Sequence, residues 1–374
     1  MQEKTLVFVG NTSWGMYNFR EKTLRKLKES GYRVVVLAPE DHFSERLRQI
    51  PVEFIPLGYL KGSGTNPLTD YQLYRELKAH YESLKPEIVF HYTVKPNIYG
   101  SLAARALKIR NVAFVTGLGY AFMRRNLVAW LIRRMYNISL RKADQVWFLN
   151  QDDIADFKKE GIRAGNKTVI VNGEGIDTRF FAPAPVTYQV PVTRFLMAAR
   201  MLGSKGVSEF VAAIGTLKKE NFNVKGVLLG PVDGDNKDAI SRADLENWEN
   251  EGAITYLGET TDVRSFIADA HCVVLPSYRE GIPRVLLEAG AMERPCITTR
   301  VPGCKEVITH GFNGFLCEPQ DSADLARQMI AFIRLTEAQK LEMAQNARKN
   351  ILARFDQPRV DRHYLDAIGE LLLR

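Results

Sequence analysis

The 374-residue sequence lacks several features that would each indicate a class of protein. No apolar run reaches the ~18 residues that a membrane-spanning helix needs. The apolar run Leu6–Val9 is too short for a secretory signal peptide, and no small-residue cleavage site follows it. The cysteines show no CxxC or histidine-rich spacing; they are Cys272, Cys296, Cys304 and Cys317. These absences predict a cytoplasmic protein with reduced thiols.

The positive charge is concentrated in the first half of the chain. The net charge is +8, yet residues 1–180 hold 28 Lys and Arg against 18 Asp and Glu, whereas the remainder holds 23 against 25. This asymmetry indicates that one half faces an anionic partner, either a membrane or nucleic acid. Because no helix-turn-helix, zinc-finger or aromatic RNA-binding signature is present, we expect no nucleic acid partner.

Short apolar runs alternate with segments of helical periodicity along the whole chain. Runs such as TLVFV and RVVVLA, and later RFLMAAR and HCVVLP, indicate strands, and the helices between them predict parallel sheets. Near Ile176 the proline-rich stretch GIDTRFFAPAPVTYQVPVTR breaks the pattern and indicates a linker. The sequence therefore predicts an α/β fold with two doubly wound, Rossmann-like domains facing a cleft, over residues 1–180 and 193–355. A helix over 356–374 follows the second sheet.

Cations follow a strand of the second half. Ligands of open α/β sheets bind beyond the carboxyl ends of the strands. Arg200 and Lys205 flank a short loop that follows FLMAAR and opens a helix, so that two positive charges stand beside helix N–H groups. This arrangement favours an anion, and a solvated surface loop is an equally weighted alternative.

The stretch SYREGIPRVLLEAGAM places two glutamates around a helix start. Pro283 suits the first position of a helix, so Glu280 precedes the helix and Glu288 lies one to two turns inside it. Either glutamate alone also fits an ordinary helix start. Paired with the cations, the two carboxylates suit the diols of a nucleoside-diphosphate sugar. The helix mouth adds backbone amides that could hold a phosphate or a hydroxyl, those of Gly281, Ile282 and Arg284.

The spacings R-x4-K-G and E-x7-E resemble the donor domain of the family 4 retaining glycosyltransferases of the GT-B fold. The resemblance covers nearly the whole chain and includes VNGEGIDTRFF, YLGETTDV and VPGCKEVITHGFNGFL. Within the family, MYNFR, HYTVKPNIYGSLAAR and TGLG are similar to α-1,3-N-acetylgalactosaminyltransferases that extend undecaprenyl-diphosphate-linked sugars.

This resemblance implies an activity. The protein would be a metal-independent retaining hexosyltransferase (EC 2.4.1.-) that needs no cofactor. It would move a hexose or N-acetylhexosamine from a UDP-sugar to a lipid-linked sugar acceptor in surface polysaccharide or glycan biosynthesis. Its C-terminal helix would pack back on the first domain.

The resemblance also implies roles for single residues. Arg200 and Lys205 would bind the diphosphate, Glu288 the ribose, and Glu280 the donor sugar, which makes Arg200, Lys205 and Glu280 the catalytic residues. The other donor-binding residues would be Gly15, Thr260, Gly281, Ile282, Pro283 and Arg284. The acceptor residues would be Trp14, Tyr17, His91, Lys95, Asn97, Thr116 and Gly117.

Two positions depart from the family pattern. Trp14 and Gly15 stand where many members have a Gly-Gly pair, which indicates an altered acceptor pocket in which Gly15 still offers its amide to phosphate. Thr116 stands where many members have a histidine near the reaction centre. His91 ends a nearby strand and is a possible substitute, although a lone histidine is more often structural. The DxD in VDGDN follows Gly-Pro and indicates a turn, not a metal site.

The segment RRNLVAWLIRRMYNISLRKA (124–143) predicts a helix with many cations and no acid. Leu127, Leu131, Met135 and Ile138 fall on one face. A second face carries cations and a tryptophan that suit an anionic membrane surface; its residues include Arg124, Arg125, Trp130, Arg133 and Arg134. An ordinary packing helix is equally consistent with the pattern alone. The charge asymmetry and the family resemblance favour a peripheral protein at the inner face of the cell membrane.

Two other functions stay open at this point. One is a sugar-nucleotide epimerase or hydrolase of the same fold, for which His91 is the visible acid or base. The other is a non-catalytic basic protein that binds a membrane or nucleic acid, which would leave the donor-site residues without a role.

Overall fold

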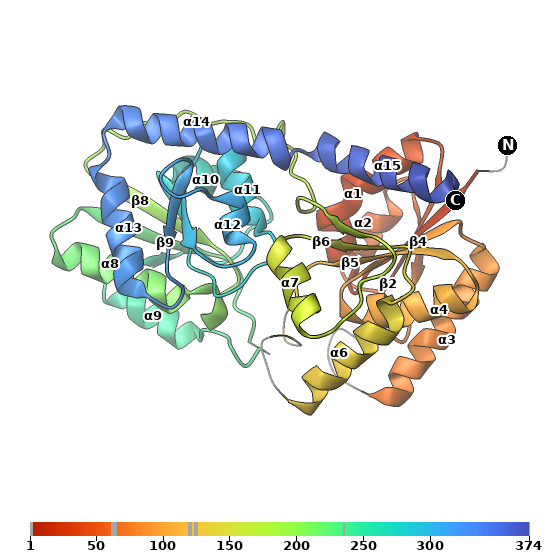
Figure 1. The fold of residues 1–374 in the computed structure, drawn as a ribbon. Helices are drawn as coiled ribbons and strands as arrows, with labels where there is room; N and C mark the ends of the chain where they lie inside the picture. The colour runs from red at the N-terminus through yellow and green to blue at the C-terminus, as the bar shows by residue number, and fades with distance from the viewer. Residues whose placement is uncertain (1–2, 61–65, 119–121, 123–125, 235, 374) are drawn as a thin grey trace. The chain divides into compact units, whose positions relative to one another are not determined.

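A computed structural model describes residues 3–60, 66–118, 122, 126–234 and 236–373 (Figure 1). The chain divides into two compact units. Unit 1 consists of Met1–Gly175 and Gln357–Arg374, and unit 2 of Ile176–Asp356. The linker that follows Gly175 belongs to unit 2, because the N–H of Ile176 donates to the carbonyl oxygen of Phe355 (2.9 Å).

Unit 1 is built on a seven-stranded parallel sheet in the order β3-β2-β1-β4-β5-β6-β7. Its central strands are buried on both faces, which is why they are apolar throughout. The strands are β1 (Thr5–Val9), β2 (Arg33–Ala38), β3 (Glu53–Pro56), β4 (Ile88–Tyr92), β5 (Arg110–Val115), β6 (Gln145–Phe148) and β7 (Thr168–Ile170).

Helices cover both faces of this sheet (Figure 1). On one face α1 (Ser13–Glu29) packs against the C-terminal helix α15 (Gln357–Leu373), whose Tyr364 meets Phe90 and Trp147 of the sheet. The opposite face is covered by α3, α4, α6 and α7. The remaining bounds are α2 (Ser44–Arg48), α3 (Pro67–Leu84), the π-helical turn η1 (Pro96–Gly100), α4 (Ser101–Ala106), α6 (Leu127–Leu140) and α7 (Gln151–Lys159).

Unit 2 is built on a six-stranded parallel sheet in the order β10-β9-β8-β11-β12-β13. Its strands are β8 (Thr193–Ala198), β9 (Val224–Leu229), β10 (Thr255–Tyr256), β11 (Cys272–Leu275), β12 (Cys296–Thr299) and β13 (Gly314–Cys317). One face packs against α8 (Val207–Lys219), α9 (Arg242–Asn250) and α13 (Ser322–Arg334). The other packs against α10 (Arg264–Asp269), α11 (Arg284–Ala291), α12 (Cys304–Val307) and α14 (Glu337–Arg354).

The predicted fold class, two doubly wound parallel sheets, is confirmed. In unit 2 the strand order makes β8, β11 and β12 neighbours although they are far apart in sequence. Their carboxyl ends therefore open at one edge of the sheet. Among the helices of the described residues, none combines the length and apolar character that a membrane span requires.

Candidate functional site

The loops that follow β8 and β11 touch at the carboxyl edge of the unit 2 sheet. The N–H of Tyr278 donates to the carbonyl oxygen of Ser204 (2.9 Å). Gly206 adopts a φ of 79°, and a Cβ there would lie 2.2 Å from the carbonyl oxygen of Pro276. Glycine is required at this position for both reasons. The side chains carried by the two loops are thus held close to each other.

Lys205 and Glu280 form an ion pair where these loops meet. Nζ of Lys205 lies 2.5 Å from Oε1 of Glu280, and the side chains are 22% and 12% exposed. The same carboxylate oxygen accepts a hydrogen bond from the hydroxyl of Ser277 (2.7 Å). Because the pair is mostly screened from water, salt weakens it less than a surface pair. The fold therefore brings together two of the three residues predicted to be catalytic.

Glu288 lies on α11 and is buried. The residue is 9% exposed, and its Oε1 accepts a hydrogen bond from Nε of Arg284, one turn earlier (2.9 Å). Burial raises the pKa of Glu288 above its ordinary value, and the Arg284 guanidinium partly opposes that rise. Pro283 is the N-cap of α11 and not its first helical residue. Glu288 is thus a carboxylate acceptor kept away from bulk water near a helix start.

Arg200, the third predicted catalytic residue, follows β8 but is much more exposed. Its side chain is 56% exposed, and one guanidinium nitrogen lies 3.3 Å from Oδ2 of Asp233. Asp233 begins the DxD stretch, whose second aspartate, at position 235, lies outside the described residues. Within the described part of the chain, no three His, Cys, Asp or Glu side chains are grouped as a metal site would need. In the structure Asp233 forms an ion pair with Arg200.

Thr260 lies in the exposed loop before α10. Its hydroxyl donates to the carbonyl oxygen of Asp262 (3.0 Å) and accepts from the N–H of the same residue (3.1 Å). The hydroxyl thus stabilises a local turn. A contact of Thr260 with a nucleobase stays a prediction.

The loop after β12 also contacts the segment that carries Glu280. The N–H of Glu280 donates to the carbonyl oxygen of Pro302 (3.4 Å). Gly303 has a φ of 82°, and a Cβ there would lie 2.3 Å from the carbonyl oxygen of Gly281. Sequence reasoning missed these supporting residues, although a Pro-Gly directly after a predicted strand is the signal that could have identified them.

The thiol of Cys304, beside this segment, is not a reactive nucleophile. Cys304, at the start of α12, is fully buried. Burial raises its pKa to about 12, so the thiol stays protonated near neutral pH. The residues of this edge that were predicted to act on the donor therefore include a lysine, an arginine and two glutamates, Lys205, Arg200, Glu280 and Glu288.

The start of α1 in unit 1 carries three predicted ligand residues, and one prediction needs correction. Trp14 is 44% exposed, and its N–H donates to Oδ2 of Asp41 (3.0 Å). Tyr17 packs against Phe43. The amide of Gly15, predicted to be offered to phosphate, instead donates to Oγ1 of the N-cap residue Thr12 (3.0 Å). A capped helix start satisfies that N–H internally.

His91 was named among the acceptor residues and as a possible acid or base, but a structural histidine was the favoured interpretation, and the structure agrees with that interpretation. Its side chain is fully buried in β4, where Nε2 lies 2.9 Å from the hydroxyl of Tyr81. Gly100 packs on the ring so closely that a Cβ would lie 2.3 Å from Cδ2. Burial lowers the pKa of His91 to about 3. The residue is a neutral structural histidine.

The other predicted acceptor residues lie near the ends of β4 and β5. Lys95 Nζ lies 2.9 Å from Oδ1 of Asp70. Asn97 is fully buried, and its Nδ2 donates to the carbonyl oxygen of Phe114 (3.0 Å), so that it joins η1 to β5 and is not open to an acceptor. Thr116 and Gly117 follow β5 and are half-buried.

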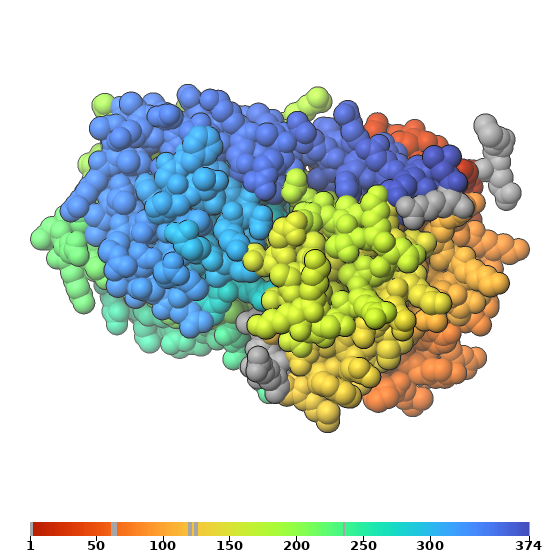
Figure 2. Space-filling view, viewed as in Figure 1, coloured from red at the N-terminus to blue at the C-terminus, as the bar shows by residue number. Residues whose placement is uncertain are grey.

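Helix α6 exposes most of its apolar face. Its buried residues are Ala129, Tyr136, Ser139 and Leu140. Leu127, Leu131 and Ile138 are 77%, 50% and 55% exposed, and Trp130 is 52% exposed. Figure 2 shows the yellow atoms of α6 at the surface of unit 1. The small side chains of Ala129 and Ser139 allow close packing on their face of the helix, so that Leu127, Leu131 and Ile138 remain exposed.

The basic residues of α6 differ from one another in their contacts. Arg133 is held by Glu160, the residue that directly follows α7 (Nε to Oε2, 3.2 Å), and its side chain is only 14% exposed. Arg134 is exposed beside the ring of Trp130. Arg124 and Arg125 lie outside the described residues. The exposed face of α6 therefore combines leucine, isoleucine and tryptophan with Arg134.

Two protein-family models match the chain, one in each unit. Residues 5–150 match the family described as glycosyl transferase 4-like, and residues 192–334 match the family described as glycosyl transferases group 1. Together the two matches cover most of both sheets.

Curated relatives match along the length of the chain. The N,N'-diacetylbacillosaminyl-diphospho-undecaprenol alpha-1,3-N-acetylgalactosaminyltransferase of Campylobacter jejuni is 29% identical over 377 residues, 96% of each chain. The UDP-Gal:alpha-D-GlcNAc-diphosphoundecaprenol alpha-1,3-galactosyltransferase of Escherichia coli is 24% identical over 75% of this chain and 76% of its own.

Solved structures share the fold of the whole chain. Anabaena HepE in complex with UDP-glucose has a TM-score of 0.80 at 19% identity, over 98% of this chain and 99% of its own. Sucrose-phosphate synthase from Thermosynechococcus elongatus has a TM-score of 0.82 at 17% identity, over 99% of this chain and 100% of its own.

Proposed function

Because the chain belongs to the family 4 glycosyltransferases of the GT-B fold, we propose that it transfers a hexose or N-acetylhexosamine from a UDP-sugar to a lipid-linked sugar. The observation that carries this proposal is the meeting of Lys205 and Glu280 at the carboxyl edge of the unit 2 sheet. Glu288 is held on α11, the helix that this segment leads into.

In this proposal the two glutamates contact different parts of the donor. Glu288 accepts hydrogen bonds from the ribose hydroxyls, which suits a buried carboxylate. Glu280 accepts from hydroxyls of the sugar. Because its Oε1 already accepts from Lys205 and Ser277, its orientation is fixed before the donor binds.

The cations serve the leaving group. When the glycosidic bond breaks, negative charge grows on the β-phosphate of UDP. Lys205 and Arg200 would stabilise that charge, which is the role a metal ion has in other transferases. Lys205 must share its charge between Glu280 and phosphate, and its partial burial makes this interaction strong. We therefore propose activity that persists in EDTA.

The stereochemical course follows from the family resemblance. We propose retention of the anomeric configuration, with the acceptor hydroxyl attacking from the face that the phosphate leaves. The departing phosphate would take the acceptor proton, so this course needs no protein nucleophile. It is compatible with the protonated Cys304 and the buried, neutral His91.

The acceptor class is suggested by the relatives. The names of the Campylobacter jejuni and Escherichia coli relatives both specify a sugar on diphospho-undecaprenol. An undecaprenyl-diphosphate-linked sugar resides in a membrane, so we propose peripheral binding at the inner face of the cell membrane. The exposed face of α6, with Leu127, Trp130, Leu131 and Arg134, has the apolar and cationic character for this contact.

One experiment tests the activity. Purified protein is mixed with a panel of UDP-sugars and undecaprenyl-diphosphate-linked acceptors, and the glycolipid product and released UDP are measured. We expect one UDP-sugar to give product, with UDP release that requires the acceptor. UDP release without acceptor would indicate a hydrolase, and interconversion of sugars would indicate an epimerase.

A second experiment tests the membrane contact. Sedimentation with anionic vesicles is compared for the wild type and for Trp130→Ser with Leu131→Ser, two exposed side chains that can change without opening the core. We expect the variant to bind more weakly and the binding to fall as salt rises. Equal binding by both proteins would contradict docking through α6.

A further inference from the structure

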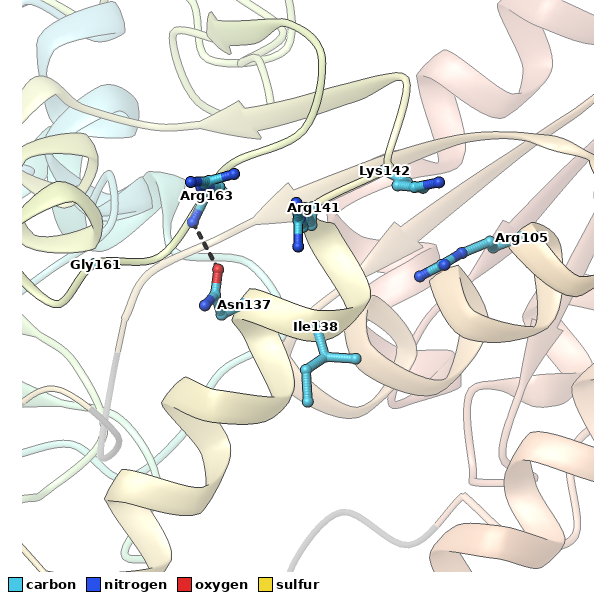
Figure 3. Close-up of a pocket in the computed structure, with 7 residues that line it drawn as sticks. All are labelled: Arg105, Asn137, Ile138, Arg141, Lys142, Gly161 and Arg163. Carbon is cyan, nitrogen blue, oxygen red and sulfur yellow. Dashed lines mark hydrogen bonds between the residues drawn. The ribbon is translucent and has the colours of Figure 1, made fainter.

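Unit 1 contains a basic hollow that none of the roles above uses. Its volume is about 450 Å³ (Figure 3). The lining residues come from the last turn of α4, the end of α6 and the loop after α7. They are Arg105, Asn137, Ile138, Arg141, Lys142, Gly161 and Arg163. Four of these seven residues are cations and none is an acid, so the hollow has the character of an anion site.

The four cations of the hollow differ from other basic residues of unit 1 in their pairing. Within the described part of the chain, no acidic side chain forms an ion pair with Arg105, Arg141, Lys142 or Arg163. Other basic residues of unit 1 do pair: Arg133, on the same helix, is held by Glu160. All four residues are exposed, so water screens much of their mutual repulsion, and a bound anion would relieve the remainder.

Helix dipoles account for only some of these positions. Arg105 lies in the last turn of α4, and Arg141 and Lys142 directly follow α6, where positive charge is favoured. Arg163 belongs to no helix, so this explanation does not reach it. Its presence opposite the ends of α4 and α6 indicates a shared ligand.

The wall that carries Arg163 is fixed in place. The N–H of Arg163 donates to Oδ1 of Asn137 on α6 (3.1 Å), the dashed line in Figure 3. Gly161, two residues earlier, adopts a φ of 68°, which favours glycine and turns the chain out of α7. The backbone of Arg163 is held in this way, and its guanidinium group can bind two phosphate oxygens at once.

An apolar ridge leads to the hollow. Ile138 lines it and is 55% exposed, and Leu131 and Leu127 continue the same exposed face at helical spacing, 50% and 77% exposed. A soluble phosphate would gain nothing from such a ridge. A membrane lipid offers both an anionic head group and acyl chains.

We propose that this hollow binds the phosphate head group of a membrane lipid, with the acyl chains beside the ridge of α6. A terminal phosphate or diphosphate fits best, because it carries up to about two negative charges and several acceptor oxygens for the four cations. The proposal rests on the membrane contact proposed above, and it adds a chemically selective site to it.

The test compares two vesicle types of equal surface charge. One contains phosphatidate, whose phosphate is terminal, and the other phosphatidylglycerol, whose phosphate is a diester. The pocket variant is Arg105→Glu with Arg141→Glu. The control variant is Lys219→Glu with Lys349→Glu, which makes the same charge change at exposed, unpaired lysines of unit 2.

The wild type should bind phosphatidate vesicles roughly thirtyfold more tightly than phosphatidylglycerol vesicles, as two additional cation–phosphate contacts would give. The pocket variant should lose this preference and the control variant should keep it. A preference retained by the pocket variant would overturn the proposal. In a competition experiment, phosphatidate vesicles should displace inorganic pyrophosphate from the wild type. If neither vesicle type displaces it, the hollow is a site for soluble anions and the proposal is overturned. A wild type that binds both vesicles equally overturns the head-group site alone, whereas one that binds no vesicle also overturns the membrane contact.

Discussion

The strand ends of the two units differ in how they treat charge. In unit 2 the loops after β8 and β11 carry Lys205 and Glu280, charged groups that are paired and only partly buried. In unit 1 His91 and Asn97, near the ends of β4 and β5, are neutral and buried, and they lie near an ion pair of Lys95 with Asp70 whose side chains are 19% and 12% exposed. Both units thus hold a partly buried ion pair near their strand ends, but only in unit 2 does the pair join two residues that were predicted to contact the donor.

This difference indicates that the two units have different roles. Charges that stabilise a leaving group must be fixed before the reaction begins, and the ion pair of Lys205 with Glu280 fixes both. The positive charge of unit 1 lies instead on its outer surface, on α6 and around the basic hollow. We therefore expect substitutions in unit 2 to affect turnover and those in unit 1 to affect stability or surface binding.

The largest effect is expected from Lys205→Ala. Loss of one fixed group facing developing charge typically lowers kcat by roughly 10²–10³-fold. The change also leaves Glu280 without its partner in a mostly buried place. Turnover is compared with that of Lys219→Ala, a change of the same kind at an exposed lysine of α8. Equal turnover in the two variants would remove Lys205 from the chemistry.

The next effect concerns pH and Glu288. The raised pKa of this buried carboxyl means that protonation begins at a higher pH than for an ordinary glutamate. UDP affinity should therefore fall as the pH falls through that raised value, because a protonated carboxyl accepts ribose hydroxyls less well. Glu288→Gln should bind UDP weakly with little pH dependence over this range. Parallel curves for both proteins would contradict the assignment.

Arg200→Ala is expected to have a smaller effect than Lys205→Ala. The guanidinium is more than half exposed and is shared with Asp233. Water screens such a charge, so we expect a loss of turnover of roughly fivefold, about 1 kcal/mol. Steady-state kinetics under identical conditions give the ratio of the two variants. A loss as great as that of Lys205→Ala would show that Arg200 is ordered by the donor.

His91→Gln should leave turnover almost unchanged and act on stability. With a folded pKa of about 3 against an ordinary 6.5, His91 binds fewer protons in the folded state than in the unfolded state. Its contribution is therefore present above pH 6.5 and is lost as the pH falls towards 3. Urea unfolding across this range should show a shallower pH dependence for the variant. A large loss of turnover at neutral pH would restore His91 as a functional residue.

Local patterns predicted the fold and the meeting of charges in unit 2. Alternating apolar runs fixed the strands, and loops after parallel strands must share one edge, so Arg200, Lys205 and Glu280 could be placed from spacing. Pairing could not be predicted, because the contact of Lys205 with Glu280 depends on close packing at Gly206.

The burial of individual side chains was the feature that the sequence predicted least well. The position of His91 at the end of a strand left a ligand contact possible beside the favoured structural role, and Tyr81 and Gly100 enclose the ring. For α6 the pattern was equally consistent with a packing helix and did not identify the buried face, which in the structure carries the small residues Ala129 and Ser139. Such choices depend on tertiary packing, which periodicity does not contain.

The proposed function depends on Glu288 contacting the ribose and Glu280 contacting the sugar. Titration of UDP alone tests this difference most directly. UDP is added to the wild type, to Glu288→Gln and to Glu280→Gln, and its affinity is measured by calorimetry. We predict that Glu288→Gln loses affinity by roughly tenfold or more, as for a hydrogen bond to a charged group. Glu280→Gln should bind UDP nearly as the wild type does and yet turn over slowly. Equal losses of UDP affinity in the two variants, or no loss in either, would contradict the account.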